Sequence, residues 1–82
     1  MDKLINARNQ IDIIDNQIME LLDKRYELSI EIGNIKKESK SQVLDSNREQ
    51  LILNKTSKLR HSLAISKVYQ SIMLESKTLQ RK

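Results

Sequence analysis

An apolar repeat with a period of 3.5 residues occupies the first half of the chain and restricts the folds open to it. Its a and d positions hold Leu4, Ala7, Ile11, Ile14, Ile18, Leu21, Arg25, Leu28, Ile32 and Ile35. Nine of these ten residues are apolar, which predicts a helix over roughly residues 4–38. Such a helix would be about 50 Å long, whereas a compact chain of this length has a radius of gyration of about 12 Å. We therefore expect the helix to extend beyond its own domain and to cover its apolar stripe with a second copy of the chain.

The rest of the chain predicts two further helices. The sequence of 82 residues has one Gly and no Pro, and its abundant Leu, Ile, Lys and Glu favour helix. A polar connector, residues 37–45, precedes a short helix over roughly 46–57, and a weaker break precedes a medium helix over roughly 62–81. The expected fold class is all-α, with one long, one short and one medium helix in a single domain spanning residues 1–82.

Composition narrows the classes of function. The absence of Cys excludes a disulfide framework and a thiolate zinc site. The first residues show no signal-peptide core and no apolar run reaches membrane-spanning length, so we expect a cytoplasmic protein without a membrane partner. Fifteen Lys and Arg against eleven Asp and Glu give a net charge of +4, which favours nucleic acid, an anionic surface or a small anionic ligand. Two Tyr are the only aromatic residues, which weakens the case for single-stranded nucleic acid.

Arg25 is the exception in the apolar stripe. A charge at such a position costs desolvation free energy, so the side chain must reach solvent, pair with an acid or bind an anion. In coiled coils generally, reaching solvent or setting the register is the commoner role. Lys36 lies eleven residues later, close to three turns, so both side chains point to nearly the same side about 16 Å apart. This spacing favours a site where two cations converge on a ligand with two anionic groups.

Arg8 lies at the edge of the same stripe, about 42 Å from Lys36 along one straight helix. The two cations cannot share a ligand within one chain. In an antiparallel dimer with a two-fold axis near residues 19–20, Arg8 of the partner subunit falls opposite the stretch between Arg25 and Lys36. We therefore expect a symmetric homodimer with two equal sites, although an ordinary exposed charge is the simpler explanation of Arg8 taken alone.

The segment DSNREQ, residues 45–50, permits two interpretations. Ser46 and Glu49 fit a capping box, with Ser46 as the N-cap and Glu49 reaching back to it, and Asp45 would lie near the positive end of the helix. Judged locally, capping is the favoured explanation. Alternatively, Glu49 accepts a hydrogen bond from a ligand hydroxyl, while Arg48 faces a ligand carboxylate or is braced by Asp45. Both interpretations hold if the helix start also contributes backbone N–H groups.

Ser76 and Gln80 continue a series of residues, with Tyr69 and Met73, at steps of three or four along the last helix. A solvated helix end explains their polarity. As site residues they would add two neutral hydrogen-bonding groups. The spacing alone leaves both explanations open.

Taken together, these polar positions resemble those of the all-helical AroQ-type chorismate mutases. The matched residues are Arg8, Arg25, Lys36, Asp45, Arg48, Glu49, Ser76 and Gln80. Seven of them lie in the segments LLDKRYEL, EIGNIK, DSNRE and ESKTLQ, and the resemblance extends from about Leu4 to Gln80. Each motif alone is weak, but their order and separations are specific. The resemblance implies an intertwined antiparallel homodimer that converts chorismate to prephenate in phenylalanine and tyrosine biosynthesis, without a metal or cofactor.

The resemblance also implies roles for the matched residues. Arg25 and Arg8 of the partner subunit would bind the two substrate carboxylates, with Ser76 assisting. Lys36 and Gln80 would donate to the ether oxygen, where negative charge grows as the C–O bond breaks.

The remaining roles concern the other side of the substrate. Glu49 and the backbone at Asp45 would hold the ring hydroxyl, and Arg48 would bind or brace the pyruvyl group. Catalysis would then combine selection of the folded, diaxial conformer with stronger binding of the transition state.

Two other functions stay open. The same scaffold serves isochorismate-pyruvate lyase, which uses a similar cationic site, although Glu49 favours the mutase. A non-catalytic basic helical dimer would instead bind nucleic acid with a strong salt dependence and would not convert chorismate.

Overall fold

Three helices make up the fold, and no strand is present in residues 2–82, the part of the chain that the computed structural model describes. The helices are α1 (Asp2–Ser39), α2 (Ser46–Thr56) and α3 (Ser62–Gln80). The prediction of an all-α chain with a long, a short and a medium helix is confirmed, and every boundary lies within two residues of the expected one. Within the same residues, no helix is both long and apolar enough to cross a membrane.

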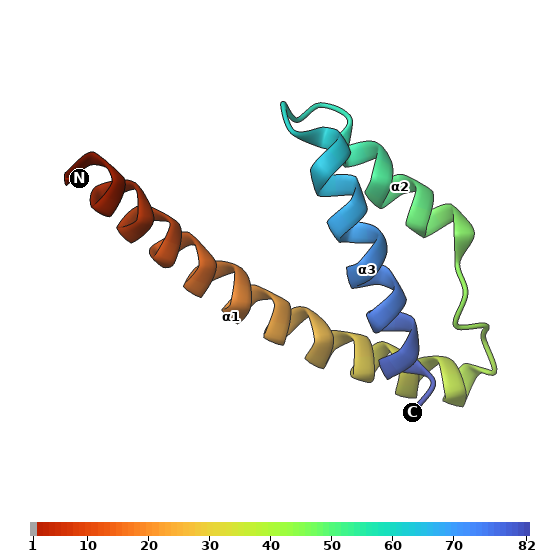
Figure 1. Ribbon diagram of the computed structural model, residues 1–82. Helices are drawn as coiled ribbons and strands as arrows, with labels where there is room; N and C mark the ends of the chain where they lie inside the picture. Colours follow the sequence, from red (N-terminus) through yellow and green to blue (C-terminus); the bar gives the residue numbers. More distant parts are fainter. Residues whose placement is uncertain (1) are drawn as a thin grey trace.

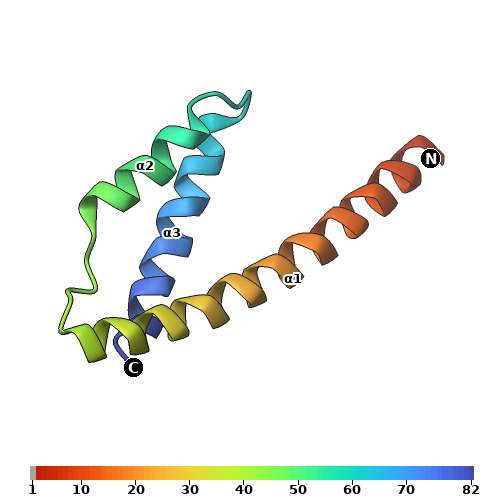
Figure 2. The ribbon, with the colours of Figure 1, turned by 180° about the vertical axis from the view of Figure 1, so that it is seen from behind.

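Helix α3 is the central element of the arrangement. It packs against α1 and against α2, whereas no Cα atoms of α1 and α2 approach within 8 Å in the described part of the chain. Figures 1 and 2 show α2 and α3 as a hairpin whose open end meets the C-terminal part of α1, while the N-terminal half of α1 projects away from both. The radius of gyration is 16.1 Å and the longest dimension is 56 Å, which exceeds the radius of about 12 Å for a compact chain of this length. The long helix therefore extends beyond its own domain, as predicted.

Two small residues on α1 allow α3 to approach it closely. Ser29 and Gly33 are buried and lie four residues apart, so they share one face of the helix. A Cβ atom at Gly33 would lie 2.5 Å from the backbone oxygen of Gln80 and 2.7 Å from its Cα. Gly33 therefore permits a backbone contact that no larger residue would allow without a shift of α3.

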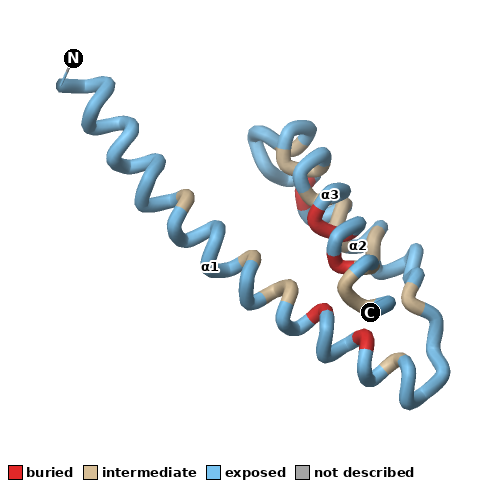
Figure 3. Tube along the Cα trace, turned by 60° about the horizontal axis from the view of Figure 1, so that its bottom comes forward, coloured by how far each residue is buried: buried red, intermediate tan, exposed pale blue. Residues whose placement is uncertain are grey.

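The apolar stripe of α1 adjoins this face, and one chain leaves most of it uncovered. Ile72 and Met73 on α3 are the only buried apolar side chains among the described residues. Figure 3 shows most of α1 as exposed. Eight residues of the stripe are 43–63% exposed, namely Leu4, Ile11, Ile14, Ile18, Leu21, Leu28, Ile32 and Ile35. The accessible surface is 7072 Å², compared with about 5,100 Å² for a compact monomer of this mass. The excess reflects the projecting helix and its exposed apolar stripe.

The start of α2 differs from the predicted capping box. The N-cap is Asp45, whose Oδ1 accepts a hydrogen bond from the backbone N–H of Arg48 at 3.0 Å. Ser46 is therefore the first residue inside the helix. In a capping box the third residue of the helix bonds back to the N-cap, and Glu49 is the fourth residue after Asp45. The prediction of Ser46 as the N-cap was wrong because Asp45, one residue earlier, offers a charged acceptor to the positive helix end.

Candidate active site

A cavity of about 300 Å³ lies where the C-terminal part of α1, the connector, α2 and α3 meet. This volume is at the lower end of the range for small-molecule sites. Seven of the eight residues predicted from the sequence line the cavity: Arg25, Lys36, Asp45, Arg48, Glu49, Ser76 and Gln80. Residues that are 55 positions apart in the chain, from Arg25 to Gln80, thus contribute to one pocket.

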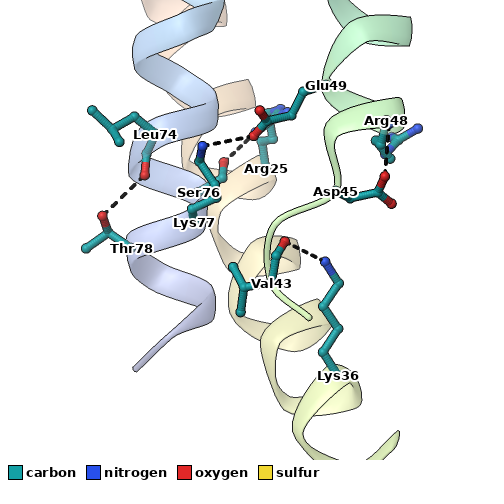
Figure 4. Close-up of polar contacts among 10 residues, drawn as sticks. All are labelled: Arg25, Lys36, Val43, Asp45, Arg48, Glu49, Leu74, Ser76, Lys77 and Thr78. Atoms are coloured by element: carbon teal, nitrogen blue, oxygen red, sulfur yellow. Dashed lines mark hydrogen bonds and ion pairs between the residues drawn. The ribbon is translucent and has the colours of Figure 1, made fainter. Parts of the chain in front are cut away.

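Arg25 is held on the cavity side of α1. Its Nη1 donates a hydrogen bond to Oγ of Ser76 at 2.6 Å, and Ser76 is only 5% exposed (Figure 4). The guanidinium is thus directed toward α3 and not into bulk solvent. Because an Arg side chain has five N–H donors, most of them remain available to an anion in the cavity.

Lys36 connects α1 to the connector. Its Nζ donates to the backbone oxygen of Val43 at 3.0 Å, and both residues line the cavity (Figure 4). The ammonium group has three donors, so this bond leaves two for a ligand. The same contact fixes the connector beside the cavity, at the point where it leads into α2.

Gln80, the last residue of α3, brings an amide group to the cavity. Its Oε1 is buried and has no hydrogen-bond partner within residues 2–82. A buried acceptor without a partner is costly, and rotation of the amide by half a turn exchanges its oxygen and nitrogen. The amide can therefore present either a donor or an acceptor to a bound molecule.

Glu49 and Lys77 form the only side-chain ion pair in the described part of the chain. Nζ of Lys77 lies 3.1 Å from Oε2 of Glu49, and the side chains are 23% and 28% exposed. Figure 4 shows Glu49 pointing from α2 toward α3, where Lys77 follows Ser76. The pair joins the two helices at the wall of the cavity.

Asp45 and Arg48 lie at the mouth of the cavity. The Asp45 carboxylate binds the backbone N–H of Arg48, so the expected bracing of the Arg48 guanidinium by Asp45 is not seen. Arg48 is exposed, and together with Arg25 it also lines a neighbouring hollow of about 270 Å³. Its guanidinium is thus the least constrained of the cavity's cations.

The cavity carries an excess of positive charge. Arg25, Lys36, Arg48 and Lys77 oppose two carboxylates, those of Asp45 and Glu49, which leaves two positive charges uncompensated. This balance suits a ligand with two negative charges. No group of three or more His, Asp or Glu side chains within residues 2–82 is arranged to hold a metal ion.

Arg8 is the one predicted site residue that lies outside the cavity. It is exposed on the projecting half of α1, and it lies seventeen positions before Arg25, which corresponds to about 25 Å of helix. A single chain therefore does not bring Arg8 to the other seven residues.

The residues of the site that were missed from the sequence include Ser29, Gly33 and Lys77. Ser29 and Gly33 follow Arg25 at successive four-residue steps, so their small size on the face of Arg25 was a usable signal for close packing. Lys77 gave a similar signal, because it lies four residues after Met73 and three before Gln80 and so shares their face of the helix.

The fold and the cavity define a small helical protein with a cationic pocket, whose excess of positive charge suits an anionic molecule. More specifically, the chain belongs to the chorismate mutase type II family, whose sequence model matches residues 7–81. The sequence-based recognition of this family is thus confirmed.

Individual relatives agree with the family match. The chain is 30% identical to a chorismate mutase of Methanocaldococcus jannaschii, over 99% of this chain and 87% of that protein. It is 35% identical to a bifunctional chorismate mutase/prephenate dehydratase of Buchnera aphidicola, over 96% of this chain, but it spans only 22% of that relative's length. A solved structure of a conserved hypothetical protein from Pyrococcus furiosus superposes with a TM-score of 0.86 at 37% identity, covering 99% of both chains.

Proposed function

We propose that this chain is a chorismate mutase, which converts chorismate to prephenate by an intramolecular Claisen rearrangement and so acts in phenylalanine and tyrosine biosynthesis. The observation that carries the proposal is the gathering of seven polar residues, expected from the resemblance, around one cavity with two excess positive charges. Chorismate bears two carboxylates, which match this charge. The family match over residues 7–81 supports a single catalytic domain spanning the chain.

Arg25 is the principal carboxylate-binding residue. Its guanidinium has free donors after the bond to Ser76, and a forked pair of N–H donors fits the two oxygens of a carboxylate. Ser76 fixes the orientation of the guanidinium and assists binding. Arg8 of the partner subunit supplies the second cation, because its own chain holds it too far away.

Lys36 and Gln80 act on the ether oxygen of the substrate. They lie on α1 and at the end of α3, and both line the cavity. As the C–O bond breaks, negative charge develops on that oxygen, so donors fixed beside it stabilise the transition state more than the ground state. The oxygen of the Gln80 amide has no partner to lose when the amide turns its NH2 group toward the substrate. Lys36 has two free donors, so both residues suit this role.

Glu49 and Asp45 hold the ring hydroxyl, Glu49 through its carboxylate and Asp45 through its backbone, while Arg48 binds or braces the pyruvyl group. The reaction needs no nucleophile and no proton transfer. Catalysis therefore rests on positioning and electrostatics: the cations select the folded, diaxial conformer of the substrate, which lowers the entropic part of the barrier.

The active form is an antiparallel, intertwined homodimer. Two facts about the single chain support this proposal: its apolar stripe on α1 is exposed along its whole length, and its surface exceeds that of a compact monomer by about 2,000 Å² per chain. That excess is the size of a large, obligate interface. An antiparallel second α1 would cover the stripe and bring its Arg8 toward the cavity.

The direct experiment is incubation of the purified protein with chorismate, without added metal or cofactor, while chorismate loss and prephenate formation are measured. Equal amounts of both support the proposal. Isochorismate serves as the second substrate, because release of pyruvate from it, with chorismate unchanged, would assign the lyase reaction instead. No turnover of either substrate would overturn the enzymatic function.

A further inference from the structure

Lys77 is a cavity residue that the proposed mechanism does not use. It lies on α3 directly after Ser76, lines the same cavity as Arg25 and Lys36, and forms the ion pair with Glu49 at 3.1 Å (Figure 4). It is therefore a fourth cation in a site for which three cations suffice to bind two carboxylates.

The carboxylate of Glu49 poses a problem for a site of this kind. Glu49 lies on the wall of a cavity whose other charged side chains include Arg25, Lys36 and Arg48. A free carboxylate there would pair with one of these cations and compete with a substrate carboxylate for it. It would also reduce the positive charge that attracts a dianion.

The ion pair removes this competition. Lys77 approaches Glu49 from α3 and holds the carboxylate against that helix. Without Lys77, the excess of positive charge in the cavity would fall from two to one. With it, the charge of Glu49 is compensated locally, while one of its two oxygens still has room to accept a hydrogen bond.

We infer that Lys77 is a positioning residue, which acts through Glu49 to keep the other cations of the cavity free for a dianionic substrate. The inference rests on the proposed function, since it assigns Glu49 to the substrate hydroxyl. A purely structural role is the competing explanation. Partly exposed ion pairs contribute little to stability, so the two explanations predict different results for substrate affinity and for thermal unfolding.

The first test is steady-state kinetics of Lys77→Met with chorismate. The expected result is a KM raised about tenfold, with a smaller change in kcat, because substrate carboxylates then compete with Glu49. Lys77→Arg keeps the charge and should restore KM to near the wild-type value. Lys67→Met is the matched control, since Lys67 is an exposed cation on the same helix that does not line the cavity. If Lys77→Met and Lys67→Met have the same KM, the inference is wrong.

A double-mutant cycle then tests whether Lys77 acts through Glu49. In a Glu49→Gln background there is no carboxylate to hold, so adding Lys77→Met should leave KM unchanged. Equal, additive increases in both backgrounds would overturn the inference, because they would mean that Lys77 binds the substrate itself. Thermal unfolding of each variant identifies any loss of folding, and Lys77→Gln replaces Lys77→Met if the latter unfolds. A wild-type protein that fails to convert chorismate would overturn the proposed function and this inference together, whereas the kinetic outcomes above overturn the inference alone.

Discussion

Replacement of Gly33 by Ala tests how the packing of α1 on α3 controls the site. The added Cβ would lie 2.5, 2.7 and 2.9 Å from three backbone atoms of Gln80. Ordinary contact distances begin near 3.4 Å, so the end of α3 must move away by about 1 Å. The obstructing atoms are backbone, and a rotamer change cannot relieve the contact.

The effects on activity and on stability should differ in size. A misplacement of about 1 Å of a catalytic group can reduce the rate by about 10²-fold, and Gln80 is the residue that moves. Overpacking costs about 1–3 kcal/mol, but Ala is a better helix former than Gly by about 1 kcal/mol. We therefore expect a net loss of about 0–2 kcal/mol in the free energy of unfolding for Gly33→Ala, with a far larger relative loss of kcat/KM.

The assay is chorismate conversion alongside urea unfolding, with Asn34→Ala as the control. Asn34 is the next residue on α1, is exposed and does not line the cavity, so its replacement should leave kcat/KM unchanged. If Gly33→Ala is as active as Asn34→Ala while the protein stays folded, the proposed dependence of catalysis on the position of Gln80 is refuted.

Other predictions address single side chains. Lys36→Ala and Gln80→Ala should each lower kcat/KM by about 10²-fold or more; unchanged turnover in either variant would remove that residue from the ether-binding role. Arg25→Leu should abolish activity but leave the melting temperature unchanged or higher, because leucine completes the apolar stripe. If sedimentation shows that this variant no longer forms the dimer, Arg25 has a structural role instead. Asp45→Ala should lower the free energy of unfolding by about 1 kcal/mol through loss of the N-cap, whereas Ser46→Ala should change it by less than about 0.5 kcal/mol. If urea unfolding shows the larger loss for Ser46→Ala, the assignment of Asp45 as the cap is wrong.

The helices of this chain could be predicted because local pattern determines them. The near absence of Gly and Pro favours helix throughout the chain. The apolar repeat from Leu4 to Ile35 and the breaks that follow it predict the helix boundaries to within two residues. The spacing of Arg25 and Lys36 predicts that both side chains lie on nearly the same side of one helix, and both line the cavity. These are properties of a single helix, whose geometry follows directly from residue number.

What the sequence did not predict depends on contacts between helices. The choice of Asp45 over Ser46 as N-cap was a competition between two good acceptors one residue apart, which residue preferences do not resolve. The pairing of Glu49 with Lys77 required knowing which faces of α2 and α3 meet. The need for Gly33 appears only when the backbone of Gln80 is placed against it.

Subunit mixing tests whether each site is assembled from two copies of the chain. Arg8→Ala and Arg25→Ala proteins, each inactive alone, are mixed under conditions that allow subunit exchange, and chorismate turnover is followed. Each heterodimer then has one intact site, so random exchange should restore about a quarter of the wild-type activity per chain. If sedimentation shows that heterodimers have formed and activity stays at the level of the separate variants, Arg8 does not act across the interface and the site is not shared between subunits.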